Sequence, residues 1–400
     1  MSDLAAVPWW VWVLMGVGAI AIIVVFAGLF LPDWHRPSRF TTTLEAPAGS
    51  EEFLQSARTF LNVPLRRGGE AEILQNGDAF FPAMLAAIRS ARETVNFQVY
   101  IFEPDLIGTQ FLEALRERAK AGVDVRMLVD AFGSHKLDKE WRAKLHEAGC
   151  RVSRFRPLRL FTLVRAWKRS HRRAIVVDGR LAFTGGGAVA DKWTGNAQDE
   201  EHWRDSMTRV TGPLASGVQT AFTQDWLYCT GEVLAGPRFY PIDDAQESAG
   251  SGPAALAVAS SPSDSAQPIR LLYWLSFRAA RERIFISSSY FIPGRQIRDA
   301  IRERAKAGVE VRILVPGEKT DAKPVRQAGR GYYEELLEAG VRIWEYEPTM
   351  MHAKTVTIDG VWSIVGSSNM DARSTEINEE NNLAVADREL ARAIEEGMLA

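Results

Sequence analysis

The sequence predicts an α/β fold of two lobes related by a pseudo-twofold axis, each with a mostly parallel sheet flanked by helices, after one N-terminal transmembrane helix. Three observations predict it: a long uncharged run near the N-terminus, a segment that occurs twice, and alternating strand and helix patterns around both copies. The 400 residues suffice for two cores or one duplicated core. The predicted boundaries are 1–40 for the anchor, 41–245 for the first lobe and 246–400 for the second.

The N-terminal run has the length of a membrane span. No charged side chain occurs from Leu4 to Pro32, and Trp9 to Leu31 would extend about 35 Å as a helix. A cleaved signal peptide favours a basic start and a shorter apolar stretch, whereas this run follows Asp3. We therefore interpret it as a retained anchor.

The charges around the run predict its orientation. His35, Arg36 and Arg39 follow it, and Asp3 precedes it. Positive charge favours the cytoplasmic side of a span. The sequence therefore predicts a single-pass protein of the cell membrane whose long C-terminal part is cytoplasmic.

Composition excludes some classes of protein. With 46% hydrophobic and 24% charged residues, an ordered globular enzyme is expected rather than a disordered chain. The formal charge of −2 gives no overall attraction to nucleic acid or anionic lipid, so any attraction must come from a local patch. Cys150 and Cys229 are too few for a disulfide framework or a zinc cage, and they suit a reducing compartment.

The duplicated segment is a helix followed by a strand. Residues 116–129 (RERAKAGVDVRMLV) and 302–315 (RERAKAGVEVRILV) agree at 12 of 14 positions. Gly122 and Gly308 suit the left-handed position that ends a helix, and an apolar strand pattern follows each.

The surroundings of the two copies also repeat. Strand patterns at 94–105 and 283–294 precede the copies, and a further helix and strand follow at 144–155 and 335–346. Such β-α-β units predict mostly parallel sheets. Residues 243–268 are rich in Ala, Ser, Gly and Pro and form the predicted boundary between the lobes.

Each half ends in a histidine motif of the same spacing. In both, a cation stands two residues after the histidine, an aspartate seven residues after it, and a glycine-led turn seven residues further. The motifs consist of His171, Arg173, Asp178 and Gly185 in the first half and of His352, Lys354, Asp359 and Gly366 in the second. An apolar stretch between cation and aspartate predicts a buried strand, and residues two apart share a face of a strand. The histidine and the cation are therefore expected to face one ligand.

Two histidines suit phosphodiester chemistry. One group must attack phosphorus and another must protonate the departing oxygen. With a pKa near 6.5, one imidazole can act as nucleophile and its partner as acid, and their duties can exchange in a second half-reaction. Arg173 and Lys354 would neutralise the phosphate oxygens. We expect neither a metal nor another cofactor, because the six histidines show no zinc-type spacing.

These motifs resemble those of the phospholipase D superfamily, His-x-Lys-x4-Asp followed by Gly-Ser-x-Asn, present twice and joined into one site. The chain is most similar to bacterial cardiolipin synthases, from about Glu72 to Asp387 and in its N-terminal helix. The second copy is complete, with Ser367 and Asn369 after Gly366. The resemblance implies two phospholipase D-like lobes.

The first copy departs from this pattern at two positions. Arg173 replaces the lysine, which keeps the charge but changes the geometry, and Ala188 replaces the asparagine. The backbone amides of Gly185, Gly186 and Gly187 are expected to compensate in part, because glycine lets the main chain approach an anion.

The resemblance implies roles for the motif residues. His171 is the expected nucleophile and His352 the acid and later base, although the reverse assignment stays open. Glu380 is expected to orient His171, and Asp205 to orient His352. We count Asp178 and Asp359 in the catalytic motif, but tying down the turn after the strand is the role we favour for them.

A basic and apolar segment leads into His171. Residues 151–173 hold nine Lys or Arg and no acid. Apolar side chains are interleaved with them, including Phe155, Leu158, Leu160, Phe161, Leu163, Val164 and Trp167. We expect this segment to meet an anionic membrane surface. A basic helix packed on the protein and a nucleic-acid track are the alternatives.

Other aromatic and histidine residues carry weaker signals. His35, His135 and His146 are expected to be surface residues, and His202 lies near Asp205 in the sequence. Tyr290 and Phe291 follow a strand and border the headgroup pocket or pack in the core. Tyr100 is taken as the equivalent of Tyr290 in the first half.

The expected function is transfer of a phosphatidyl group between phosphatidylglycerol molecules through a phosphohistidine, with release of glycerol. The expected partners are anionic membrane phospholipids and the bilayer, without nucleic acid. Hydrolysis by a phospholipase D, a nuclease activity and a membrane-bound scaffold with a degenerate site are the alternatives. Nothing in the residues themselves separates water from an alcohol as acceptor.

Overall fold

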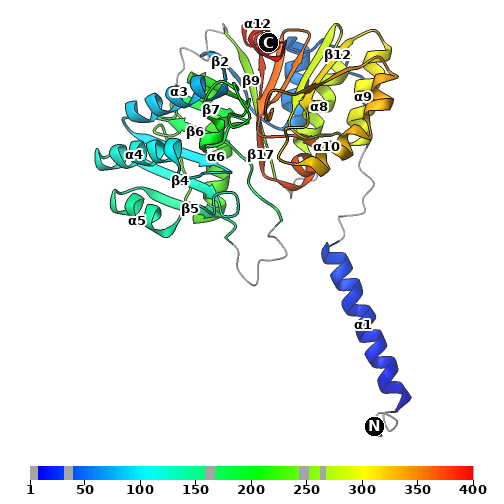
Figure 1. Cartoon of the computed structure of the whole chain (residues 1–400), viewed down its shortest axis with the longest axis horizontal. Helices are drawn as coiled ribbons and strands as arrows, with labels where there is room; N and C mark the ends of the chain where they lie inside the picture. Colours follow the sequence, from blue (N-terminus) through cyan, green and yellow to red (C-terminus); the bar gives the residue numbers. More distant parts are fainter. Residues whose placement is uncertain (1–7, 31–38, 158–166, 243–251, 262–266, 400) are drawn as a thin grey trace. The chain divides into compact units, whose positions relative to one another are not determined.

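The computed structural model describes residues 8–30, 39–157, 167–242, 252–261 and 267–399 (Figure 1). The chain has two parts, Met1–Thr42 and Thr43–Ala400. The first part contains helix α1 (Trp9–Phe30), which has 22 residues and no charged side chain. Within the described residues, no helix is long and apolar enough to cross a membrane. The predicted anchor therefore stays a prediction.

The second part contains two large sheets. Within the described residues, the first has seven strands and the second has eight. The first sheet has the order β2 (Ala71–Gln75), β8 (Ser206–Thr211), β7 (Leu181–Gly185), β6 (Ala174–Val177), β3 (Thr94–Val99), β4 (Asp124–Asp130), β5 (Arg151–Phe155). The second has the order β1 (Leu65–Arg67), β9 (Ala254–Ser260), β17 (Glu380–Ala386), β15 (Trp362–Gly366), β14 (Lys354–Ile358), β10 (Arg283–Ser288), β12 (Glu310–Pro316), β13 (Arg342–Tyr346). Apart from β1, the two orders repeat strand for strand, as expected for a duplicated unit.

Helices flank both sheets, as predicted (Figure 1). Beside the first lie α3 (Asn76–Ser90), α4 (Leu106–Lys120) and α5 (Lys139–Glu147). Beside the second lie α8 (Pro268–Ala279), α9 (Arg295–Lys306), α10 (Lys323–Arg330) and α11 (Tyr333–Leu337). Helix α6 (Ala215–Thr230) contacts β6 and β7 of one sheet and β9 and β17 of the other. The two sheets therefore share a core, in which Phe155 and Phe222 cluster with Leu383 and Ile394.

The duplicated segment folds as expected. Helix α4 ends at Lys120 and α9 at Lys306, and the glycines that follow, Gly122 and Gly308, have φ of +90° and +91°. The left-handed backbone turns the chain directly into β4 or β12. The pseudo-twofold axis itself stays a prediction.

The prediction of mostly parallel sheets is wrong. In the described parts of the two large sheets, β3–β4–β5 and β10–β12–β13 pair in parallel, and the other strand pairs are antiparallel. The physical reason lies in the turns after β6 and β14. Asp178 and Gly179 have φ of +52° and +64°, and Asp359 and Gly360 have +52° and +62°. Two residues with positive φ close a tight hairpin, which is too short for a parallel crossover.

Two segments lie elsewhere than predicted. The predicted boundaries assign strand β1 to the first lobe, but it pairs with β9 of the second sheet. In the helix before it, α2 (Glu51–Leu61), the ring of Phe53 packs against that of Trp362, with 5.3 Å between the ring centroids. The predicted linker at 243–268 contains β9, an inner strand. Its small residues have a purpose, because a Cβ on Gly217 of α6 would lie 2.3 Å from the Cβ of Ala257. Composition alone made a closely packed strand look like a linker.

Candidate active site

Each histidine lies just before a strand and is bonded to the other half of the chain. His171 precedes β6 and donates its backbone N–H to Glu379 O at 2.8 Å. His352 precedes β14 and donates its backbone N–H to Arg204 O at 2.7 Å. Isolated parallel bridges join Ser170 to Glu379 and Arg204 to Met351. Glu379 and Arg204 directly precede Glu380 and Asp205, so these bonds place each imidazole beside an acid of the opposite half.

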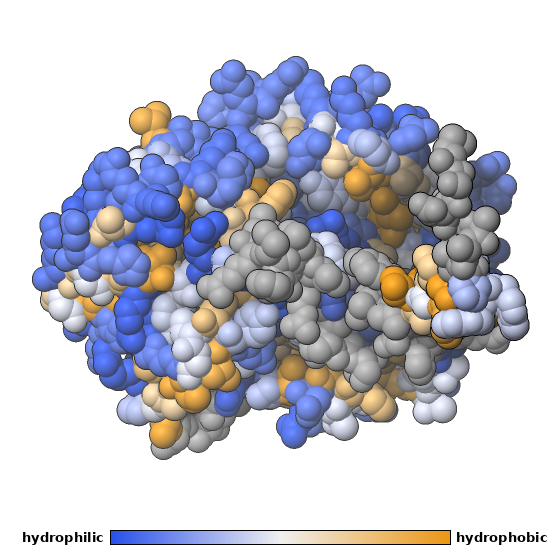
Figure 2. Space-filling view, turned by 90° about the horizontal axis from the view of Figure 1, so that it is seen from below, coloured by the Kyte–Doolittle hydropathy of each residue, from blue (hydrophilic) through white to orange (hydrophobic). Residues whose placement is uncertain are grey.

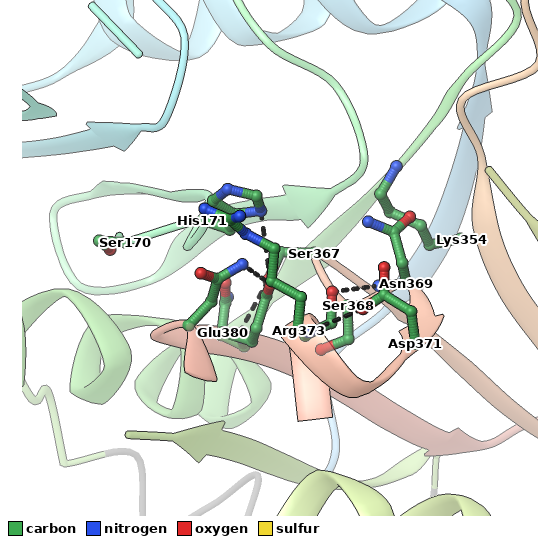
Figure 3. A network of polar contacts seen from close by, with 12 residues as sticks. Ser170, His171, Lys354, Ser367, Ser368, Asn369, Asp371, Arg373 and Glu380 are labelled. Atoms are coloured by element: carbon green, nitrogen blue, oxygen red, sulfur yellow. Dashed lines mark hydrogen bonds and ion pairs between the residues drawn. The ribbon is translucent and has the colours of Figure 1, made fainter. Parts of the chain in front are cut away.

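Each imidazole pairs with the acid that follows the backbone partner of its histidine. His352 Nδ1 lies 2.7 Å from Asp205 Oδ2, and His171 Nδ1 lies 3.4 Å from Glu380 Oε1. Both carboxylates are fully buried. Because a carboxylate can only accept, the Nδ1 hydrogen of His352 points to Asp205 and leaves Nε2 for proton transfer. Figure 3 shows His171 together with Glu380 and Ser367, and Lys354 beside Asn369.

The buried acids have further partners that fix them. Asp205 accepts the indole N–H of Trp193 at 2.9 Å and the backbone N–H of Ser206 at 2.7 Å. Glu380 accepts the hydroxyl of Ser367 and the amide of Asn378. Ser367 thus contacts the acid beside His171, and its role in orienting or in phosphate binding stays a prediction.

The two motifs form one electrostatic site. Burial, followed by Arg173, Arg373, Lys354 and His352, lowers the pKa of His171 well below its ordinary value. Charged groups of both halves therefore act on one imidazole. The Asp178 and Asp359 carboxylates are not among the groups that shift the pKa of either imidazole most strongly.

Burial lowers the pKa of both imidazoles and so favours their neutral forms. Burial and the neighbouring Lys354 lower the pKa of His352 to about 4, and Asp205 opposes this shift. Burial also lowers the pKa of Lys354 to about 7 and raises that of Glu380 to about 7. An arriving phosphate would add the negative charge that these buried cations lack, and it would favour protonated His352 and Lys354.

Lys354 is held by its own half. Its Nζ donates to Ser289 Oγ at 2.5 Å and to His352 O at 2.6 Å, and it lies 3.1 Å from His352 Nε2. Ser289 in turn donates to Asn369 Oδ1 at 2.8 Å. Lysine, serine and asparagine therefore form a chain of contacts at the side of His352.

The first half has a different set at the equivalent positions. The strand register pairs Gln98 with Ala174 and Ser287 with Thr355, so Tyr100 corresponds to Ser289 and not to Tyr290 as we expected. The ring of Tyr100 lies 4.1 Å from that of His171, centroid to centroid. The aromatic ring of Tyr100 thus lies where the second half has the hydroxyl of Ser289. Arg173 stands at the position of Lys354, and Ala188 at that of Asn369.

The backbone amide of Gly186 does not have the phosphate-binding role that we expected. Its backbone N–H donates to Ser206 O at 3.0 Å, so this amide is not open to a phosphate. A Cβ at Gly186 would lie 2.2 Å from Asp205 Oδ1. The glycine is needed because the orienting acid of His352 lies against it.

Asp178 and Asp359 lie at the far end of their strands from the histidines. Asp178 accepts the backbone N–H groups of Arg92, Glu93 and Thr94 at 2.8–2.9 Å. Asp359 accepts those of Arg281, Glu282 and Arg283 at 2.8–2.9 Å. The structure does not bring these two carboxylates to the imidazoles, so we correct the catalytic assignment in favour of the turn-fixing role. Each one holds the start of the neighbouring strand β3 or β10.

The basic segment, residues 151–173, contains buried residues as well as exposed ones. Residues 158–166, with Leu158, Leu160, Phe161, Leu163 and Val164, lie outside the described residues. At its ends, Arg151–Phe155 form strand β5, and Phe155 is buried. Arg169 and Arg172 are buried as well and pair with Asp130 at 3.5 Å and Asp225 at 3.1 Å. The membrane-facing prediction is therefore wrong for these cations, because acids inside the protein already neutralise them.

Some neighbours of the site carried no signal that we used. Arg373 influences His171, and Trp193 and Trp203 lie against His352 at 5.4 and 5.7 Å between ring centroids. Ser289 would have been found by aligning the two strands in register rather than by matching tyrosines. His202 bonds Asp199 at 2.6 Å, and His135 and His146 are exposed, as expected.

Comparisons with known proteins agree with this arrangement. Residues 84–226 and 276–399, more than half of the chain, match the family model described as cardiolipin synthase, PLD-like domain. Cardiolipin synthase 2 of Bacillus anthracis is 36% identical over 326 residues, which cover 81% of this chain and 63% of the relative. Cardiolipin synthase A of Pseudomonas fluorescens is 35% identical over 346 residues, which cover 84% and 69%. The chain thus spans about two thirds of the length of these relatives.

A solved structure shares the fold. Phosphatidylserine synthase of Haemophilus influenzae superposes with a TM-score of 0.64 at 17% identity and covers 87% of this chain and 90% of its own. At that identity the likeness concerns the fold alone. Together with the family match over both halves, it leads to one conclusion: the chain belongs to the family of cardiolipin synthase PLD-like domains.

Proposed function

We propose that the protein is a phosphatidyltransferase that makes cardiolipin from two molecules of phosphatidylglycerol. The observation that carries the proposal is the pair of imidazoles, each held by a buried acid of the opposite half, around one site with Arg173 and Lys354. The sequence relatives named cardiolipin synthase support the choice of substrate. Arg173 and Lys354 bind the phosphate oxygens in this proposal.

In the first half-reaction, His171 attacks phosphorus through the ring nitrogen that does not face Glu380. A nitrogen–phosphorus bond forms and the bond from phosphorus to the glycerol oxygen breaks. His352, protonated once the anionic phosphate is bound, gives its Nε2 proton to that oxygen, and glycerol leaves. We assign His171 as the nucleophile because burial and the neighbouring cations lower its pKa, whereas Asp205 at 2.7 Å favours the charged form of His352.

In the second half-reaction, neutral His352 takes the proton of a hydroxyl group of another phosphatidylglycerol. The hydroxyl oxygen attacks phosphorus, the nitrogen–phosphorus bond breaks, and His171 is released unchanged. Both steps conserve atoms and charge. Water in place of the lipid alcohol would yield phosphatidic acid.

Purified protein with phosphatidylglycerol vesicles tests this proposal. Cardiolipin and glycerol in equal amounts are expected, and their formation should stop in His171→Ala and His352→Ala. Phosphatidic acid as the sole product would replace the proposal by a hydrolytic phospholipase D. If both alanine variants retained the effect of the protein in cells, the protein would act as a membrane-bound scaffold and not as an enzyme.

We further propose that α1 anchors the protein to the cell membrane as a single span, with the C-terminal part cytoplasmic. Its 22 uncharged residues, with the cations that follow at 35–39, support this proposal. In the view of Figure 2, hydrophobic residues lie scattered among hydrophilic ones. Alkaline extraction of membranes should leave the protein in the pellet, and removal of residues 1–40 should release it. Extraction of the intact chain at alkaline pH would contradict a span.

A further inference from the structure

A tyrosine and an aspartate stand together close to the phosphate-handling groups without a role in the chemistry above. Tyr290 directly follows Ser289, the residue that holds Lys354. Its hydroxyl lies 2.9 Å from both carboxylate oxygens of Asp321. Ser288 Oγ donates to Tyr290 O at 2.9 Å, so the backbone that carries the ring is fixed as well.

The segment that carries Asp321 is tied to the opposite half. Lys319, two residues earlier, bonds Glu200 Oε1 at 2.9 Å and donates to Pro348 O at 3.0 Å. The backbone N–H of Ala322 donates to Thr320 Oγ1. Asp321 itself is exposed. Asp321 therefore lies on an exposed segment whose Lys319 side chain contacts the opposite half.

The charge of Asp321 reaches the site. It opposes the lowering of the pKa of Lys354 and that of Lys192, each of which is caused mainly by burial. Lys192 lies over the rings of Trp193 and Trp203, at 4.8 and 4.2 Å from their centroids, and both rings pack against His352. Lys192 thus lies on the two rings that pack against His352, and Asp321 is joined through Tyr290 to the backbone next to Ser289, the partner of Lys354.

A carboxylate beside a phosphate site calls for an explanation. It repels the phosphate, so it must face another part of the substrate. Hydroxyl groups can donate to Asp321 and accept from Lys192, whereas an ammonium headgroup would meet the charge of Lys192. The combination of a fixed acceptor and a cationic donor therefore matches a neutral polyol.

We propose that Tyr290, Asp321 and Lys192 form a subsite for the hydroxyl groups of a glycerol-like headgroup, where the leaving alcohol departs and the accepting alcohol enters. The inference rests on the proposed function, which requires an alcohol at His352 in both half-reactions. Tyr290 positions the carboxylate, and Asp321 and Lys192 bind the hydroxyls. The subsite would select a polyol over water as acceptor.

A donor whose leaving group needs no polyol subsite isolates the accepting step. Purified full-length protein is supplied with phosphatidyl-p-nitrophenol in mixed micelles, with glycerol, ethanol or ethanolamine as acceptor and water always present. Release of p-nitrophenol reports the first step, and the ratio of phosphatidyl alcohol to phosphatidic acid reports the second. Asp321→Asn and Tyr290→Phe are compared with the wild type.

The glycerol product ratio should fall at least about tenfold in Asp321→Asn, which corresponds to about 1.4 kcal/mol, and by a smaller factor in Tyr290→Phe. The ethanol ratio should change less than about twofold, and any change in the release of p-nitrophenol should be smaller than the fall in the glycerol ratio. Matched controls are Asp299→Asn, a carboxylate on α9 that pairs with Arg302, and Tyr240→Phe, whose hydroxyl bonds Thr223. Both controls should behave as the wild type.

The other outcomes are distinguishable. An unchanged glycerol ratio in Asp321→Asn would overturn the subsite while the proposed function stands. A loss confined to ethanolamine would also overturn it, because the carboxylate would then read an ammonium group. If the wild type releases no p-nitrophenol, the proposed function fails first.

Discussion

The two histidine motifs share strand register and acid pairing but differ in what surrounds the phosphate-binding cation. In the second half, Lys354 contacts Ser289, and Ser289 contacts Asn369. In the first, the equivalent positions hold Arg173, Tyr100 and Ala188. The departures of the first copy therefore concern one cluster of neighbouring positions rather than scattered losses.

The comparison suggests a division of labour. Tyr100 covers one face of His171 at 4.1 Å and burial lowers the pKa of that imidazole, which suits a neutral nucleophile. His352 contacts the amino group of Lys354 through Nε2 and forms a short bond to Asp205 through Nδ1. These contacts suit a group that carries a proton. A duplicated fold thus gives two motifs of the same spacing different chemical environments within one site.

Removal of the histidines should give the largest effects and should separate their duties. With phosphatidyl-p-nitrophenol, His171→Ala should lose the stoichiometric burst of p-nitrophenol and at least about a thousandfold in turnover. His352→Ala should keep much of the burst, because p-nitrophenolate leaves without a proton, but it should fail to turn over. Rapid-quench kinetics with detection of phosphohistidine measures both. A burst in His171→Ala and none in His352→Ala would reverse the assignment.

Replacement of the orienting acids should give the next largest effects, and unequal ones. Asp205→Asn breaks a 2.7 Å contact of the proton carrier, so turnover should fall about a hundredfold. Glu380→Gln affects a 3.4 Å contact and should cost about tenfold. Steady-state rates on phosphatidylglycerol vesicles test the order. Equal losses would mean that the two halves orient their imidazoles equally strongly.

The sequence was sufficient for the parts of the fold and site that depend on short-range patterns. Gly122 and Gly308 mark helix ends because a left-handed residue is a local requirement, and the spacing of the histidine motifs predicts strands with fixed faces. The pairing of His171 with Glu380 and His352 with Asp205 is also present as contacts. The resemblance, rather than the spacing, supplied that pairing.

Features set by long-range packing could not be predicted in this way. Strand β9 looks like a linker because its alanines are small, and only the close approach of Gly217 explains them. The cations Arg169 and Arg172 look like a surface patch because their acids, Asp130 and Asp225, lie 39 and 53 residues away in the sequence. Tyr100 was matched to the wrong residue because an identical side chain is a weaker guide than strand register.

The loss of activity at alkaline pH should follow the deprotonation of Lys354, the cation of the second half. Burial lowers the pKa of Lys354 to about 7, so its ammonium loses a proton as pH rises through that value. The value of kcat/KM, which reports the free enzyme, should then fall about tenfold per pH unit above about pH 8. Lys354→Arg should move this fall to higher pH, because arginine stays charged.

A second titration overlaps with that of Lys354 and requires a control. Burial raises the pKa of Glu380 to about 7, and its ionisation adds negative charge in the same pH range. Profiles of kcat/KM for Glu380→Gln should therefore keep the alkaline fall if Lys354 causes it. Loss of the fall in Glu380→Gln, with its retention in Lys354→Arg, would assign it to the acid.

The smallest effect is expected where the first half is made more like the second. Arg173 is buried and its pKa is lowered mainly by burial, yet arginine remains charged at neutral pH. Arg173→Lys keeps that charge, so activity on phosphatidylglycerol vesicles should stay within about tenfold, or about 1.4 kcal/mol of barrier. A lysine here lacks the hydroxyl partner that Ser289 gives Lys354, so the same change with Tyr100→Ser and Ala188→Asn should recover the second-half cluster. A much larger loss in Arg173→Lys, and no recovery in the triple variant, would show that the planar guanidinium itself is required and that the cluster does not act as a unit.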